Sequence, residues 1–147
     1  MNRLQKALVG IFILLIVIQF IRPQRNLSDR GSENEIALKY PVPAEVQGIL
    51  KNSCYDCHSN NTRYPWYSHI QPIGWWIQSH VNEGKEHLNF SEFGTYSEKR
   101  ARHKFEEIEE SMNTGWMPLE SYTIIHKDAI LTAEQSNAVR TWAASLK

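Results

Sequence analysis

The most apolar stretch of the chain runs from Ala7 to Ile21 and is interrupted only by Gly10 and Gln19. As a helix this stretch measures about 22 Å, which is somewhat shorter than a hydrocarbon core of about 30 Å. Basic residues stand on both sides of it, so charge does not settle which end lies inside. The residues that follow are too bulky for a signal-peptidase site. We therefore expect residues 1–25 to form an uncleaved signal anchor, a transmembrane helix.

The pattern changes after this stretch. Residues 26–43 are polar, contain Pro41 and Pro43, and lack a sustained period, which is typical of a linker. A chain of 147 residues is long enough for one modest domain and a tail. We expect the domain to occupy residues 44–147.

Within this domain, four segments place apolar residues three and four positions apart, as amphipathic helices do. The segments are residues 43–54, 72–84, 97–112 and 131–147. In the third, Ser97 is a suitable N-cap, and in the fourth Thr132 and Gln135 predict a capping box. Only YTIIH at 122–126 has appreciable β preference, and no partner strand is evident. The sequence predicts an all-α fold with long loops.

The second of these segments carries aromatic residues at helical spacing. Gly84 is a possible terminator of this helix. The spacing predicts an inward face made of Ile73, Trp76, Ile77, His80 and Val81.

Composition narrows the possible partners. The 16 basic and 16 acidic residues balance, so the chain lacks the net positive charge that draws proteins onto nucleic acid, and we expect no nucleic-acid partner. The 5 Trp, 6 Tyr and 5 Phe residues are many for this length. They can enclose a flat apolar cofactor or form an ordinary aromatic core.

The only two cysteines lie in the motif CYDCH, as Cys54 and Cys57, with His58 directly after them. A thioredoxin-type dithiol would open a helix after a buried strand, whereas here a helix precedes the pair. A structural zinc site would need four ligands, and the chain offers no second pair of cysteines. Covalent haem attachment needs only these three residues: two thiols for the porphyrin vinyl groups and one imidazole for the iron. We favour one covalently attached haem c.

Met117 is the best candidate for the sixth iron ligand. It follows the third predicted helix in the irregular segment NTGWMPLESY, and a thioether ligand raises the reduction potential. Met117 is alternatively a core residue. His80 is the competing ligand because it lies on the predicted inward face.

The order of a helix, CYDCH, a Met-Pro loop and a final helix resembles a monohaem class I c-type cytochrome. More narrowly, SCYDCHSNNTRYPWYSHIQPIGWW, VNEGKEHLNFSEF and MPLESYTIIHKDAILT are similar to the bacterial haem-binding domain family of small anchored proteins. The resemblance covers about residues 40–146. It implies a cytochrome c-like helical fold, haem binding in the cell envelope, and a loop methionine as distal ligand.

Near the motif, Arg63 is a candidate partner for a haem propionate, and Tyr64, Trp66 and Tyr67 are candidate walls of the pocket. Each of these residues can equally pack on the outer helices. A backbone carbonyl near Pro65 or Pro72 is expected to accept the Nδ1 proton of His58.

These observations predict a single-pass protein of the bacterial inner membrane, with its haem domain on the periplasmic side. Its expected role is to pass single electrons between envelope redox partners, and it is not expected to be an enzyme by itself. Two alternatives stay open. One is a haem enzyme or a gas or redox sensor with an open sixth coordination site, and the other is a non-haem module that uses the dithiol.

Overall fold

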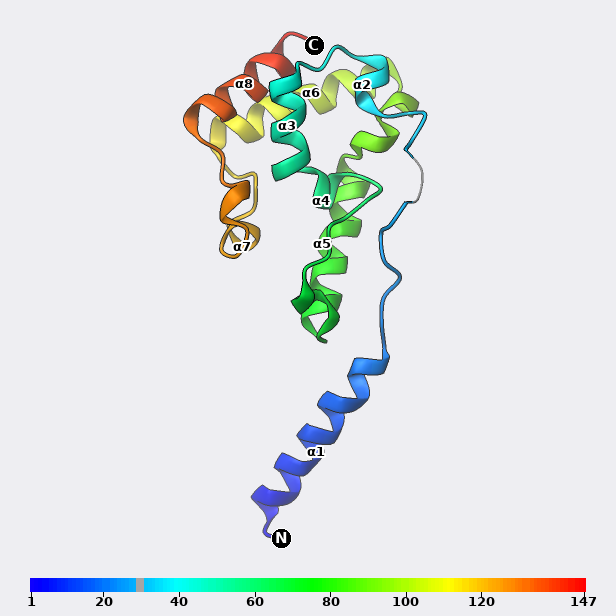
Figure 1. The fold of residues 1–147 in the computed structure, drawn as a ribbon, viewed down its shortest axis with the longest axis vertical. Coiled ribbons are helices and arrows are strands. Elements are labelled where there is room, and N and C mark those ends of the chain that lie inside the picture. The colour runs from blue at the N-terminus through cyan, green and yellow to red at the C-terminus, as the bar shows by residue number, and fades with distance from the viewer. Residues whose placement is uncertain (29–30) are drawn as a thin grey trace.

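The computed structural model describes residues 1–28 and 31–147, and every regular element in these ranges is a helix. A long helix, α1 (Arg3–Val17), projects away from a helical body that carries the C-terminus (Figure 1). The other described elements are η1 (Ile18–Phe20), α2 (Ile36–Lys39), α3 (Ala44–Ser53), α4 (Tyr55–His58), η2 (Trp66–His69), α5 (Ile73–His87), η3 (Phe90–Thr95), α6 (Glu98–Thr114), α7 (Glu120–Thr123), η4 (Lys127–Ala129) and α8 (Ala133–Ala144). The predicted all-α fold with an apolar N-terminal helix is confirmed.

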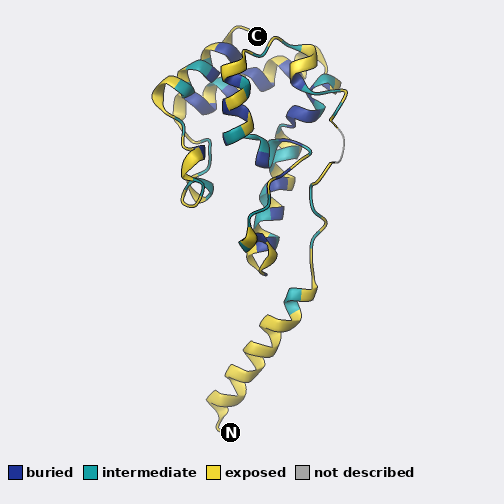
Figure 2. Ribbon diagram, in the orientation of Figure 1, coloured by how far each residue is buried: buried dark blue, intermediate teal, exposed yellow. Residues whose placement is uncertain are grey.

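The core of the body lies where α6 and α8 pack together with α3 and η3 (Figure 2). All four residues of the predicted apolar stripe of α6 are buried, namely Ala101, Phe105, Ile108 and Met112. The Phe105 ring is fully buried. It makes edge-to-face contacts with Tyr40 and Trp142, with ring centroids 5.1 and 5.7 Å apart. Aromatic packing of this kind adds to the apolar burial that stabilises the body.

The predicted helix starts of the body are also confirmed. The Ser97 hydroxyl accepts a hydrogen bond from the Arg100 amide at 3.3 Å. Thr132 and Gln135 form the capping box, in which each side chain accepts from the backbone of the other. At its other end, α6 is closed by Gly115, whose φ of 68° lies in the left-handed region that favours glycine.

The helix expected over residues 43–54 is confirmed as α3. Helix α3 ends at Ser53, and a short separate turn, α4, carries Cys57 and His58. The segment 122–126 with its β preference forms no strand, because its first residues belong to α7 and the rest to a turn.

Helix α5 corrects one prediction. Of the expected inward face, only Val81 is buried, whereas Ile73 and Trp76 are about half exposed. The helix instead buries Gly74 and Gln78. Gly74 lets the Ser68 carbonyl of η2 come close, and the Gln78 side chain accepts a hydrogen bond from the Tyr64 hydroxyl at 2.6 Å.

The expected linker is partly packed on the domain. Ile36 in α2 is fully buried in the core. The Asn26 side chain donates to the Ser59 carbonyl at 2.8 Å and to the Thr62 hydroxyl at 2.9 Å. Positions 29 and 30 lie outside the described residues. The segment therefore does not behave as a free tether along most of its length.

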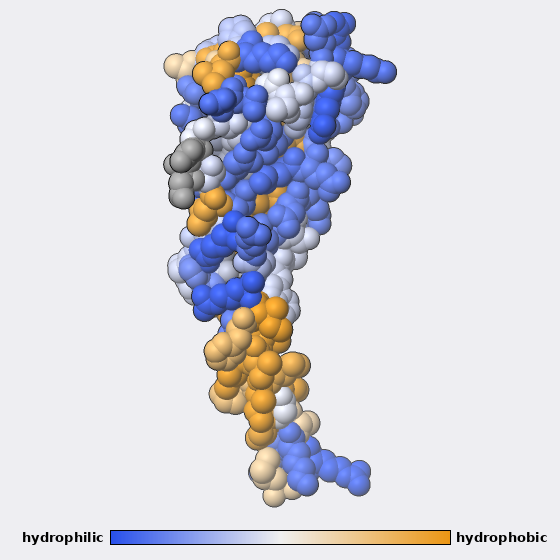
Figure 3. Space-filling view, turned by 90° about the vertical axis from the view of Figure 1, so that its right-hand side faces the viewer, coloured by the Kyte–Doolittle hydropathy of each residue, from blue (hydrophilic) through white to orange (hydrophobic). Residues whose placement is uncertain are grey.

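The N-terminal helix projects from the body and meets it at η1, where Gln19 pairs with Gln71. The continuous helical stretch Arg3–Phe20 is long and apolar enough to cross a membrane, and none of it is buried. A signal sequence shares these features, so length and composition fit an anchor without distinguishing the two. On the face drawn in Figure 3, this stretch forms a continuous hydrophobic surface below the more hydrophilic body.

Candidate haem-binding site

The cysteines and the histidine of the motif share one turn of backbone. The amides of Cys57 and His58 both donate to the Cys54 carbonyl, at 3.2 and 3.0 Å. Cys54 is the residue between α3 and α4, and its backbone leaves the helical conformation at φ −125° and ψ −38°. This break lets the motif form a compact turn on its own, below the end of α3.

His58 is held through one ring nitrogen. Its Nδ1 lies 2.9 Å from the carbonyl oxygen of Gly84 and 2.9 Å from that of Leu88, both at the carboxyl end of α5. Because carbonyls only accept, these contacts assign the proton to Nδ1 and leave the Nε2 lone pair free. Burial lowers the pKa of His58, which favours the neutral, ligating form.

The carbonyls that hold His58 come from an unexpected place. We predicted a carbonyl near Pro65 or Pro72, but the last turn of α5 supplies both acceptors. The Gly84 carbonyl also accepts from the Leu88 amide at 2.9 Å, whereas Leu88 itself follows the last residue of the helix.

Gly84 explains how α5 comes this close. A Cβ at this position would lie 2.7 Å from the Cys57 carbonyl oxygen and 3.1 Å from the Cys57 Cβ. The sequence suggested Gly84 as the end of this helix. The structure shows instead that α5 continues to His87. The role of Gly84 is to let α5 rest directly on the motif.

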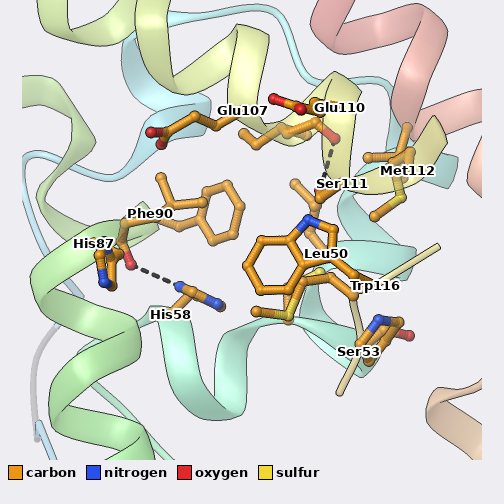
Figure 4. A pocket seen from close by; sticks show the side chains of 16 residues that line it. Leu50, Ser53, His58, His87, Phe90, Glu107, Glu110, Ser111, Met112 and Trp116 are labelled. Atoms are coloured by element: carbon orange, nitrogen blue, oxygen red, sulfur yellow. Dashed lines mark hydrogen bonds between the residues drawn. The ribbon is translucent and has the colours of Figure 1, made fainter. Parts of the chain in front are cut away.

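Two adjoining cavities flank the motif, with volumes of about 440 and about 310 Å³. Volumes of this order are typical of cofactor sites. Seven residues line both cavities: Ser53, Cys54, His58, His87, Trp116, Met117 and Pro118. In Figure 4 the His58 ring points into the first cavity, and its dashed hydrogen bond lies on the side away from it. The structure thus brings Cys54, His58 and Met117 to one cleft, with Cys57 on its second cavity.

Met117 reaches this cleft from the loop between α6 and α7. It is half-buried and packs against the core. The loop is fastened to the motif, because the Tyr122 hydroxyl in α7 donates to the Asp56 carboxylate at 2.7 Å. The Tyr122 ring also stacks on His126 at 4.2 Å. Asp56, the residue before Cys57, therefore ties the two sides of the cleft together.

The thiols are free and protonated. Burial, the larger cause, and the neighbouring Cys57 raise the pKa of Cys54 to about 12. Burial and the Asp56 carboxylate raise the pKa of Cys57 to about 11. A redox dithiol needs a thiolate with a lowered pKa, which this environment opposes.

The zinc alternative lacks a ligand set in the described chain. Among residues 1–28 and 31–147, no three side chains of His, Cys, Asp or Glu surround a point that a metal ion can occupy. A structural zinc site takes four such ligands.

His80, the alternative ligand, lines the second cavity only. Its Nδ1 lies 2.9 Å from the Trp76 carbonyl oxygen, one turn earlier in α5, and its ring is 4.3 Å from the Trp76 ring. His80 therefore belongs to the same helix whose end supplies the carbonyls that hold His58.

Four other predicted residues lie outside the two cavities. Arg63 donates to Asp56 at 3.1 Å and is exposed on another face. The Tyr64 hydroxyl donates to Gln78 at 2.6 Å, and Trp66 is 76% exposed. The Tyr67 hydroxyl forms a hydrogen bond with His126 Nε2 at 2.7 Å, and Tyr67 likewise does not line the cleft. Arg63 is engaged by a carboxylate of the motif itself, which explains why it is turned away from the cleft.

Sequence reasoning missed most of the apolar wall. The first cavity is lined by Leu50, Phe90, Ile108, Met112 and Val139, which come from four separate elements. Leu50, Ile108 and Met112 lie on the apolar stripes of their helices, and such a stripe predicts burial but not the cavity that these residues line. The polar residues Glu107, Glu110 and Ser111 of α6 border the same cavity.

The donor set and the cavity suit a haem. An apolar cleft lined by aromatic and aliphatic side chains fits a flat porphyrin, and a buried neutral imidazole with a free nitrogen fits an iron. His58 and Met117 would hold the metal, and the two thiols would hold the porphyrin edge.

Comparison with known proteins gives a consistent result. The haem-binding domain family matches residues 13–145, which is most of the chain. Among curated proteins and solved structures, nothing matches significantly. With the cleft and its free imidazole, this match establishes that the chain belongs to the haem-binding domain family and is a haem-binding protein.

Proposed function

We propose that this protein is a membrane-anchored monohaem c-type cytochrome that transfers single electrons in the cell envelope. The observation that carries the proposal is the state of His58. Its Nδ1 is occupied by two backbone carbonyls, and its free nitrogen points into an apolar cleft that also holds Cys54 and Met117. Haem, when bound, supplies an iron that changes its oxidation state by one electron.

Covalent attachment is supported by the motif and the thiols. Each S–H of Cys54 and Cys57 would add across one vinyl double bond, with sulfur bonding one carbon and hydrogen the other, so that no oxidant is needed. Because one compact turn holds both thiols, it can serve two vinyl groups on the same porphyrin edge.

Met117 is our proposed distal ligand. It lines both cavities, and the Tyr122–Asp56 hydrogen bond fastens its loop to the motif. A thioether ligand favours ferrous iron and excludes small molecules from the sixth position. With both axial positions filled by protein, the chain itself would act as an electron carrier and not as an enzyme.

The proposed location follows from the N-terminal helix and the type of haem. Helix α1 with η1 is long and apolar enough to anchor the chain. Haem c is attached on the outer side of the bacterial inner membrane, so the domain would face the periplasm and the N-terminus the cytoplasm. The partners would be redox proteins of the envelope.

Absorption spectra of the purified haem-loaded protein test the ligand assignment. We expect low-spin spectra in both oxidation states, and a shift to high spin in Met117→Ala. Met112→Leu is the matched control, because it changes the other methionine of the cavity and should leave the spectra unchanged.

Two results would contradict the proposal. A low-spin spectrum that survives Met117→Ala but is lost in His80→Ala would assign the sixth ligand to His80. A high-spin resting spectrum of the unchanged protein would favour the enzyme or sensor, whose sixth position is open.

A further inference from the structure

The lower end of the domain touches the end of the N-terminal helix. The Gln19 side chain donates to the Gln71 carbonyl at 3.1 Å and accepts from the Gln71 amide at 2.9 Å. The Trp75 indole donates to the Ile21 carbonyl at 2.7 Å. The tip formed by η2 and the first turn of α5 therefore lies at the level where α1 and η1 end (Figure 1).

Gln19 is informative because it is a polar residue near the end of an apolar run. A glutamine at the edge of a membrane needs hydrogen-bond partners, since unpaired polar groups are costly there. The backbone of Gln71 supplies both a donor and an acceptor. The pairing thus fixes the tip at the depth of Gln19.

The same tip exposes large apolar side chains. Trp66 and Trp76 are 76% and 50% exposed, and Ile70 and Ile73 are each 44% exposed. Tryptophan is enriched at membrane–water interfaces, where its ring contacts lipid and its N–H stays hydrated. A cluster of such residues in contact with an anchor helix is expensive to leave in water.

Charge at the tip favours the same surroundings. Residues 62–82 contain no aspartate or glutamate, and neither do residues 1–28. Arg22 and Arg25 lie where the two segments meet, and Arg25 stacks over the Tyr64 ring at 4.7 Å. Positive charge without nearby acids complements anionic lipid headgroups.

We propose that this tip, made of Trp66, Ile70, Ile73 and Trp76, is a second membrane contact that inserts into the lipid headgroup region. The inference rests on the proposed anchor, because it is α1 that brings the tip to the surface. Helix α5 runs from this tip to the carbonyls that hold His58, a length of about 22 Å at about 1.5 Å per residue. Two contacts with the membrane would therefore fix the height and orientation of the haem cleft.

The test measures depth with nitroxide labels on the haem-loaded full chain. Labels are introduced through an unnatural azido amino acid, so that Cys54 and Cys57 are untouched. The chain is placed in vesicles of phosphatidylethanolamine and phosphatidylglycerol. One label replaces Ile70 at the tip, one replaces Ile13 in α1, and a matched control replaces Leu38, which is 71% exposed in α2 at the opposite end of the domain. Relaxation of each label by oxygen, which concentrates in lipid, is compared with relaxation by a water-soluble nickel complex.

We expect the ratio of relaxation by oxygen to relaxation by nickel to be highest at Ile13 in the hydrocarbon core, intermediate at Ile70 in the headgroup region and lowest at Leu38 in water. If the label at Ile13 is in lipid but the one at Ile70 behaves like that at Leu38, the second contact is overturned and the anchor stands. If the label at Ile13 is also in water, the anchor fails and the second contact fails with it.

Discussion

Helices α5 and α6 carry the same sequence signal and use it differently. Both place apolar residues three and four positions apart. In α6 the resulting stripe is buried in the core, whereas in α5 Ile73 and Trp76 remain about half exposed. Apolar periodicity therefore shows that a helix face needs a partner, but not that the partner belongs to the same chain. For α5 the partners proposed above are haem on the side of His80 and lipid at the tip.

The two helices also differ in how they pack within the domain. Helix α6 contacts α8 through large side chains such as Phe105. Helix α5 contacts η2 through Gly74, where an added Cβ would lie 2.4 Å from the Ser68 carbonyl oxygen. It contacts α4 through Gly84, where an added Cβ would lie 2.7 Å from the Cys57 carbonyl oxygen. The first kind of packing stabilises the body, and the second positions the motif.

The largest effect on stability is expected in α6. Phe105→Ala should reduce the free energy of unfolding by about 3–5 kcal/mol, because it removes a fully buried ring and leaves a cavity. Leu38→Ala, at an exposed site in α2, should change it by less than about 0.5 kcal/mol. Urea unfolding, monitored by circular dichroism, measures the free energy of unfolding of both variants. Equal losses would contradict the assignment of Phe105 to the core and Leu38 to the surface.

In α5, Gly84 is the position where we expect substitution to affect stability most. Gly84→Ala should destabilise the fold by about 1–3 kcal/mol, since its methyl group overlaps the Cys57 backbone. Gly48→Ala in α3 is the control: nothing lies within 4 Å of the added methyl, so it should stabilise the protein by about 0.5–1 kcal/mol. The measurement is again urea unfolding, together with the yield of haem-loaded protein. A neutral Gly84→Ala would show that α5 does not rest on the motif as described.

A smaller effect is expected for the hydrogen bond between Tyr122 and Asp56, which we call the strut across the cleft. Tyr122→Phe removes the hydrogen bond to Asp56, so the Met117 loop should open more readily. Imidazole, competing for the sixth position, should bind about fivefold more tightly, which corresponds to about 1 kcal/mol. Spectral titration measures this affinity.

Tyr55→Phe is the matched control for the strut. It removes a similar hydrogen bond, from Tyr55 to Glu35 at 2.6 Å, which ties α2 instead of the Met117 loop. Unchanged imidazole affinity in this variant, beside a change in Tyr122→Phe, supports the strut. Equal shifts in both would point to general loosening.

The smallest effect is a loss of stability in alkali. Burial and the hydrogen bonds to Glu35 and Asp56 raise the pKa of Tyr55 and Tyr122 above the usual 10.0. Above about pH 10, the unfolded chain loses these protons while the folded chain keeps them, so stability falls as pH rises. Urea unfolding between about pH 9 and about pH 11 should show a shallower fall in the two Phe variants. The same slope in all three proteins would contradict these shifts.

Local sequence signals predicted much of the body, but they did not predict contacts between residues that are far apart in the sequence. Ser97 and Thr132 were readable as caps because their partners lie three residues away. The carbonyls for His58 were misplaced because they are 26 and 30 residues distant. Asp56 looked like a spacer between the cysteines, yet it binds Tyr122, 66 residues later. Arg63 was a plausible propionate partner by type, but the same Asp56 engages it.

Intact mass and colour of the denatured chain test the central claim most directly. The full protein is expressed with the cytochrome c maturation machinery, extracted with acid acetone, and analysed by mass spectrometry and haem staining of a denaturing gel. We predict that one haem stays on the polypeptide and is lost in the double variant Cys54→Ala/Cys57→Ala. A colourless chain with the mass of the bare polypeptide would contradict covalent attachment, and with it the c-type cytochrome proposed here.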